Sequence, residues 1–154
     1  MRLGAPTLAL LLLLSLLATA CPADGPDMSK IIGNWVVYTE LNFEVCGTVQ
    51  AGQCSDWEAS PDDEAVLACF TDGLAACAPV RLTQSRPTVE GDPIVETFFV
   101  YPRGSDCTVV RFMDTTADTF GPQAVYRYDC PTATVDASCD VLVTGGCDDW
   151  TARW

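Results

Sequence analysis

The nine cysteines of this 154-residue chain restrict its fold and its location more than any other feature. Neighbouring cysteines are at least eight positions apart, so the chain has no C-x-x-C motif of the kind found in zinc sites and thioredoxin-like redox centres. So many cysteines in one small chain are typical of disulfide-bonded proteins of oxidising compartments. The sequence therefore predicts one exported domain that disulfides stabilise.

The first 20 residues have the organisation of a signal peptide. Arg2 supplies a positive charge, and residues 8–17 form a run that is apolar except for Ser15. This run is about half as long as a membrane-spanning helix needs to be. Ala18-Thr19-Ala20 fits cleavage by the ordinary signal peptidase, which would release a secreted protein.

The same segment also resembles the lipobox of bacterial lipoproteins, in which small residues precede a cysteine that receives lipid. Cys21 stands in that position, although Ala18 stands where that family favours leucine. The odd number of cysteines supports lipidation, because lipid on Cys21 leaves eight cysteines for four disulfides. We therefore expect a signal peptide over residues 1–20, a lipidated tether over residues 21–29 and a domain over residues 30–154. Such a protein is anchored to a membrane and faces the periplasm or the cell exterior.

The composition argues against several kinds of partner and chemistry. The chain has 21 acidic and 8 basic residues, and removal of Arg2 leaves 7 basic residues and a net charge of −14. A surface of this sign repels phosphate backbones, so nucleic acid is not an expected partner. The chain has no histidine, which is the commonest general base and metal ligand, and it has neither a G-x-S-x-G motif nor a P-loop. We interpret the acidic groups Asp62-Asp63-Glu64 and Asp148-Asp149 as solvated surface, and we expect no enzyme activity, cofactor or metal site.

Hydrophobic patterning predicts a mainly β domain. Apolar and polar residues alternate from Gly33 to Val45, as in a long strand with one buried face. A short helix is expected at residues 62–67, and Gly73 is a candidate for its end. Segments rich in β-branched and aromatic residues predict further strands at residues 80–83, 94–101, 107–113, 123–130, 139–144 and 147–154. Tight turns between them, including a two-residue turn at Gly145-Gly146, indicate an antiparallel meander.

The motif Gly33-x-Trp35, at the start of the first expected strand, resembles the signature of lipocalins and fatty-acid-binding proteins. In that family the tryptophan closes the floor of an up-and-down barrel, and an arginine from near the C-terminus covers it. Arg153 is the first candidate for this arginine and Arg127 is the second. The resemblance implies a lipocalin-like barrel, whereas a small disulfide-rich β-sandwich is the alternative fold.

Two functions stay open at this point. The first is a lipid-anchored binding module that holds a small apolar ligand inside a barrel lined by Trp35, Val37, Leu41 and Phe99. The second is an envelope or surface lipoprotein that acts through protein–protein interactions and has a filled core. A cavity of about 300 Å³ or more would favour the first function.

The strand pattern also predicts part of the disulfide pairing. Pairing residues 107–113 with residues 123–130 so that Cys107 lies opposite Cys130 also places Arg111 opposite Tyr126, and it predicts a Cys107–Cys130 disulfide. Close spacing suggests Cys46–Cys54 and Cys69–Cys77 as further pairs.

The two remaining cysteines have no assigned partners. A tight turn at Gly145-Gly146 would hold Cys139 and Cys147 too far apart to bond to each other. Their partners therefore stay open at this stage.

Overall fold

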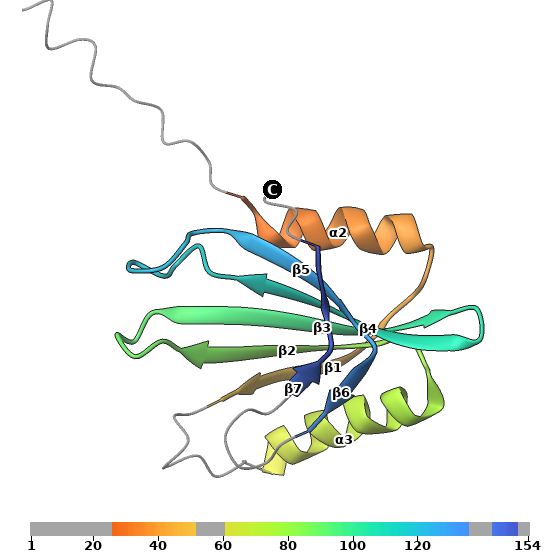
Figure 1. The fold of residues 1–154 in the computed structure, drawn as a ribbon. Helices are drawn as coiled ribbons and strands as arrows, with labels where there is room; N and C mark the ends of the chain where they lie inside the picture. Colours follow the sequence, from red (N-terminus) through yellow and green to blue (C-terminus); the bar gives the residue numbers. More distant parts are fainter. Residues whose placement is uncertain (1–25, 52–60, 136–142, 151–154) are drawn as a thin grey trace, which may run out of the picture.

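A six-stranded sheet with one helix on each face forms the body of the protein in the computed structural model (Figure 1). The structure describes residues 26–51, 61–135 and 143–150. The elements follow the order α2 Met28–Thr39, β1 Glu44–Gln50, α3 Pro61–Ala76, β2 Val80–Pro87, β3 Pro93–Arg103, β4 Asp106–Asp114, β5 Val125–Cys130, β6 Thr132–Thr134, β7 Val143–Gly145 and β8 Asp148–Trp150. No helix within these ranges is long and apolar enough to cross a membrane.

The sheet has the strand order β1-β2-β3-β4-β5-β8, and its strands are mostly antiparallel. The exception is the parallel pair β1 and β2, which α3 connects. The expectation of a mainly β chain with an antiparallel meander is therefore confirmed for β2 to β5. Within the described residues β1 and β8 are the two ends of an open sheet, so the expected up-and-down barrel is wrong there. Among the same residues the second sheet has only the short strands β6 and β7, which is not the arrangement of the alternative β-sandwich.

The segment that was expected to begin the first long strand is the helix α2. Asp27 caps this helix, since its carboxylate accepts hydrogen bonds from the backbone N–H groups of Ser29 and Lys30 at 2.9 and 3.3 Å. Glu40, with φ 56°, ends it in the left-handed region. Several apolar residues of this segment also fit the period of a helix. Those that contact the sheet recur every three or four positions, and they are Met28, Ile31, Ile32, Trp35 and Val36.

The two faces of the sheet carry separate hydrophobic clusters because neighbouring strand residues point to opposite sides. Phe98 and Val109 belong to the cluster beneath α3, whereas Phe99 and Val110 belong to the cluster beneath α2. All four of these side chains are buried. The alternation thus produces three layers, with the sheet between the two helices.

The helix expected at residues 62–67 is confirmed and extends to Ala76. Its first turn carries Asp62, Asp63 and Glu64, where negative charge interacts favourably with the helix dipole. Gly73 does not end the helix. It lies within α3 against β2, and a Cβ atom at this position would come within 2.4 Å of Val80 Cγ2. The glycine therefore permits close contact between helix and sheet.

The β-hairpins of the meander lie where the sequence predicts them, but the register of one strand pair differs from the predicted one. Strands β3 and β4 are joined at Gly104-Ser105, and Gly104 has a φ of 64°. Strands β4 and β5 pair as expected, but Arg111 lies opposite Tyr128 in place of Tyr126. Because this shift is two residues, each side chain keeps the face that the alternation assigns to it.

Three disulfides join the described residues, and none has the predicted pairing. They are Cys46–Cys69, Cys77–Cys107 and Cys130–Cys147. Cys107 does not face Cys130 because the shifted register places Val109 there. The neighbour pairs fail because α3 separates Cys69 from Cys77 along its length and brings Cys69 to β1.

The partner of Cys147, which the sequence left open, is Cys130. The glycines at 145 and 146 do not form the expected hairpin turn, since β7 pairs with β6 and β8 pairs with β5. Cys54 and Cys139 lie outside the described residues.

Candidate functional site

A groove of about 400 Å³ lies between α2 and the strands β2 and β3. It forms because α2 rests on the sheet by one side only, and none of its residues is fully buried. The apolar part of the groove comes from Met28, Ile32, Val36 and Val95. Its polar part comes from Ser29, Arg81, Thr83 and Thr97. The groove is thus mainly apolar with a few polar groups, which is typical of sites for small molecules.

Three of the four polar residues of this groove, Arg81, Thr83 and Thr97, lie on the neighbouring strands β2 and β3. Thr83 and Thr97 are cross-strand partners, and their Oγ1 atoms are 3.4 Å apart. Arg81, two residues before Thr83, is half-buried. It forms no ion pair with any other residue that the structure describes. Its guanidinium group is therefore the basic group of the groove that could receive an acidic group of a ligand.

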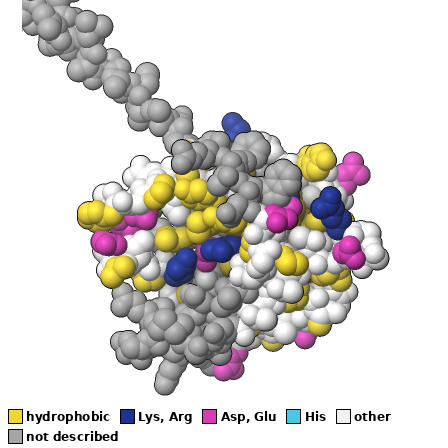
Figure 2. All heavy atoms as spheres, in the orientation of Figure 1, with side chains coloured by type: hydrophobic (Ala, Val, Ile, Leu, Met, Phe, Trp, Pro, Cys, Tyr) yellow, Lys and Arg dark blue, Asp and Glu magenta, His cyan; other side chains and the backbone are white. Residues whose placement is uncertain are grey.

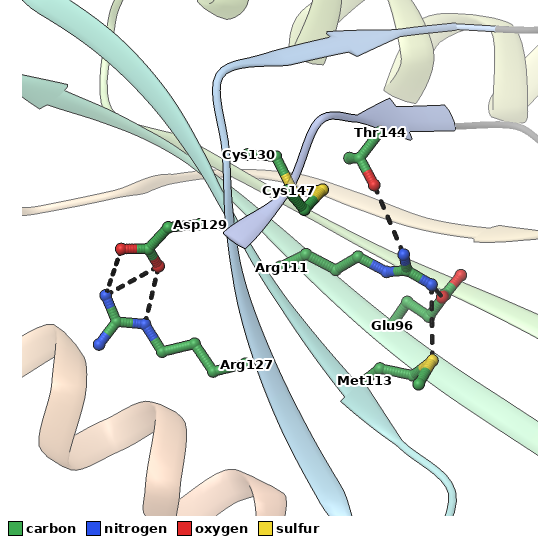
Figure 3. The surroundings of a disulfide bond; sticks show 8 residues. All are labelled: Glu96, Arg111, Met113, Arg127, Asp129, Cys130, Thr144 and Cys147. Carbon is green, nitrogen blue, oxygen red and sulfur yellow. Dashed lines mark hydrogen bonds and ion pairs between the residues drawn. A yellow bond between two sulfur atoms is a disulfide. The ribbon is translucent and has the colours of Figure 1, made fainter. Parts of the chain in front are cut away.

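Two smaller grooves lie on the opposite side of α2. They have volumes of about 250 and 290 Å³, and Trp35, Tyr38 and Arg127 line both. Arg127 donates two hydrogen bonds to Asp129, each 3.0 Å long (Figure 3). Its guanidinium carbon is 5.8 Å from the centre of the Trp35 ring. The charge of Arg127 is thus already engaged by a carboxylate and an aromatic ring.

Aromatic rings fill the space beneath Trp35. The ring centres of Phe43, Phe99, Tyr101 and Phe112 are 5.0–5.7 Å from that of Trp35. Phe99 is fully buried, whereas Trp35 itself is half-buried. These contacts explain why α2 settles on this part of the sheet, since each such ring pair contributes about 0.5–1.5 kcal/mol beyond the burial of its area.

The residues expected to line a barrel therefore have several different surroundings. Trp35 and Phe99 contact each other in the cluster beneath α2, and Leu41 packs beside them. The assignment of Val37 is wrong, because its side chain is 77% exposed on the outer side of the helix. Gly33 is exposed in α2, and a Cβ atom there would meet nothing within 4 Å. Arg153 and Cys21 lie outside the described residues.

A second polar cluster, which was not predicted from the sequence, lies on the α3 face of the sheet. Glu96 on β3 is only 2% exposed, and its carboxylate forms an ion pair with Arg111 on β4. Gln84 Nε2 donates a hydrogen bond of 3.0 Å to Glu96 Oε2, and Arg86 Nε is 3.5 Å from the same oxygen. The strand period could have located this cluster, since Glu96 lies two residues before the buried Phe98 and so shares its face.

The Arg111 side chain connects the sheet to the small β6–β7 sheet (Figure 3). Its Nη1 atom donates to Thr144 Oγ1 at 3.4 Å, and its guanidinium carbon is 5.2 Å from the centre of the Tyr128 ring. The Cys130–Cys147 disulfide joins two cysteines that are 17 positions apart in sequence, one before β6 and one after β7. Arg111 thus links the buried Glu96 to Thr144 on β7, and a network of this kind helps to hold the β6–β7 sheet in place.

The chain is thus a mainly β, disulfide-bonded domain of three layers with an open groove beside its first described helix. Comparisons with known protein families, with curated proteins and with solved structures found no match. Among the described residues no three or more acidic, cysteine or histidine side chains come together in a way that could hold a metal ion.

Proposed function

We propose that this chain is an exported, lipid-anchored binding domain that has no catalytic role. The observation that carries the proposal is the groove between α2 and β2–β3, where apolar walls surround two threonine hydroxyls and Arg81. The site differs from the barrel interior expected from the sequence, because it lies beside a helix and opens at the surface.

Export and anchoring are supported by the chemistry of the cysteines. The three disulfides indicate an oxidising, extracytoplasmic environment. The lipobox-like sequence before Cys21, together with the odd cysteine count, supports lipid at that residue. We propose that the domain faces the periplasm or the cell exterior from this anchor.

The groove is suited to a small amphipathic molecule. Its volume of about 400 Å³ falls within the range of about 300–1,000 Å³ that small-molecule sites usually have. Met28, Ile32 and Val36 would contact an apolar body, whereas Arg81 would bind a carboxylate or another anionic group. The ligand that we propose is therefore mainly apolar with one acidic end.

Titration with 1-anilinonaphthalene-8-sulfonate, which is apolar and carries one negative charge, tests the groove. Arg81→Gln should weaken binding about fivefold to tenfold, because a charge-assisted hydrogen bond is lost. Arg103→Gln is the matched control, since Arg103 lies on the same face of the sheet but outside this groove. Equal affinities of the two variants, with unchanged melting temperatures, would rule out the groove as the anion-binding site.

Recognition of another protein is the second candidate function. The aromatic rings that fill the space beneath Trp35 favour it, because they remove the enclosed cavity that a barrel-type ligand would need. Extraction of the natively purified protein into organic solvent separates the two functions. A small molecule recovered in stoichiometric amount supports ligand binding, and a ligand-free extract together with an Arg81-insensitive titration supports the protein partner.

A further inference from the structure

Helix α2 differs in charge from the rest of this acidic protein. The chain has 21 acidic residues, but none lies between Met28 and Thr39, where Lys30 is the one charged side chain. The helix instead exposes Val37 and Tyr38, which are 77% and 83% accessible. Acidic side chains are scattered over the face drawn in Figure 2, whereas the sequence of α2 contains none.

The helix on the opposite face of the sheet is strongly acidic. Helix α3, on the other face of the sheet, carries Asp62, Asp63 and Glu64 in its first turn and no basic residue in its last turn (Figure 1). On the face of the sheet that α2 covers, the side chains of Arg81 and Arg127 line the grooves beside this helix. Helix α3 is therefore strongly acidic, whereas α2 carries one basic and no acidic side chain between its caps Asp27 and Glu40.

The length of the tether keeps α2 close to the anchor. Asp27, which caps the helix, is six residues after Cys21. Six residues span at most about 20 Å when fully extended. The start of α2 therefore cannot lie farther than about that distance from the membrane surface if Cys21 carries lipid.

We propose that α2 lies on the surface of the membrane that holds the Cys21 anchor, with Val37 and Tyr38 in the headgroup region. This inference rests on the lipid anchor of the proposed function. An anionic bilayer repels the acidic α3 layer and attracts Lys30, so the charge distribution turns the domain in this direction. Tyrosine is well suited to the interface, because its ring is apolar and its hydroxyl stays hydrated.

Hydrogen exchange of the lipidated protein in vesicles of phosphatidylglycerol and phosphatidylethanolamine tests this orientation. Peptides that cover residues 28–39 should exchange at least about threefold more slowly on vesicles than in the soluble Cys21→Ser protein. Peptides that cover residues 61–76 should exchange at the same rate in both. Equal rates for the α2 peptides on vesicles and in solution would overturn the proposal.

Two valines supply a matched pair of variants for the same experiment. Val37→Asp and Val89→Asp add one negative charge each at positions that are 77% and 91% exposed, and Val89 lies in the turn between β2 and β3. Val37→Asp should abolish the slow exchange of α2 on vesicles, whereas Val89→Asp should retain it. Loss of protection in both variants, or in neither, would contradict a specific role of the α2 face.

A second form of the protein separates failure of the anchor from failure of the orientation. The chain contains no histidine, so a hexahistidine sequence in place of residues 1–21 can attach it to vesicles that contain a nickel-chelating lipid. If the native protein does not float with vesicles, the lipid anchor is wrong. If the histidine-attached protein then shows no protection of α2, the orientation is wrong independently.

Discussion

The guanidinium carbon of Arg127 on β5 lies 5.8 Å from the centre of the Trp35 ring on α2, which joins the helix to the sheet by a cation–π contact. Trp35 also contacts four other aromatic rings. Trp35→Ala should therefore lower the free energy of unfolding by about 2–4 kcal/mol, somewhat less than for a fully buried ring. Chemical denaturation measures this loss. Tyr38→Ala, on the exposed side of the same helix, should change it by less than about 0.5 kcal/mol, and equal effects would contradict the contact.

Replacing one glycine in each helix with alanine should change the stability of the protein in opposite directions. Gly33→Ala should stabilise the protein by about 0.5–1 kcal/mol, because alanine favours the helix and nothing lies within 4 Å of the new Cβ atom. Gly73→Ala should destabilise it by about 1–3 kcal/mol despite the same gain in helix propensity, because the Cβ atom would overlap Val80. Thermal unfolding of both variants measures whether each substitution raises or lowers the stability. A stabilising Gly73→Ala would mean that α3 lies farther from β2.

Glu96 should contribute more to stability than the other paired carboxylates of the sheet. Its removal in Glu96→Ala leaves Arg111 and Gln84 without their partner in a buried environment, at an expected cost of about 2–4 kcal/mol. Asp129→Ala breaks the more accessible pair with Arg127 and should cost about 1 kcal/mol or less. Urea denaturation curves of the two variants should separate clearly, and coincident curves would refute the buried role of Glu96.

Asp92 links the β2–β3 turn to the loop after β4 in a pH-dependent manner. The Thr119 hydroxyl, and then the Thr119 backbone N–H, donate hydrogen bonds to Asp92 Oδ2 and lower the pKa of this carboxyl from its ordinary 3.8. A depressed pKa stabilises the fold above pH 3.8, and this contribution is lost as the pH falls from there through the folded-state pKa.

Thr119→Val removes the hydroxyl and retains the backbone N–H group. The pKa of Asp92 in this variant should rise toward 3.8 because the larger of its two stabilising interactions is gone. The carboxyl carbon shift of Asp92, followed by nuclear magnetic resonance during an acid titration, reports the change. Ser105→Ala, in the turn between β3 and β4, should leave this titration as it is, and an unaltered curve for Thr119→Val would disprove the link.

Strand patterns predicted the meander well because the relevant contacts are local. The segments around Phe98 and Val109 alternate and are joined by the turn at Gly104, so their pairing needs no knowledge of distant residues. The strand predicted around Trp35 was wrong because Ile31, Ile32, Trp35 and Val36 also fit the 3.6-residue period of a helix. Asp27 caps the helix, but a side chain that caps a helix is hard to distinguish by sequence from one in a turn.

The disulfide pairing and the groove depend on contacts that sequence spacing does not encode. Cys46 meets Cys69 because α3 crosses beside β1, and Cys77 meets Cys107 because the end of α3 lies near the start of β4. Arg81 becomes part of a groove only when α2 lies across β2 and β3. The packing of a helix on a sheet therefore decides both features, and the sequence specifies that packing only through the whole fold.

The mass of the N-terminal peptide from protein purified out of the membranes of the producing cell tests the lipid-anchored binding domain most directly. A lipid anchor at Cys21 predicts that the mature chain begins at this residue and that the peptide carries the added mass of a diacylglyceryl group, with or without a further acyl chain. It also predicts that Cys21→Ser moves the protein from the membrane to the soluble fraction. A mature chain that begins at another residue, or an unmodified Cys21 in protein that stays bound to the membrane, would contradict the lipid anchor.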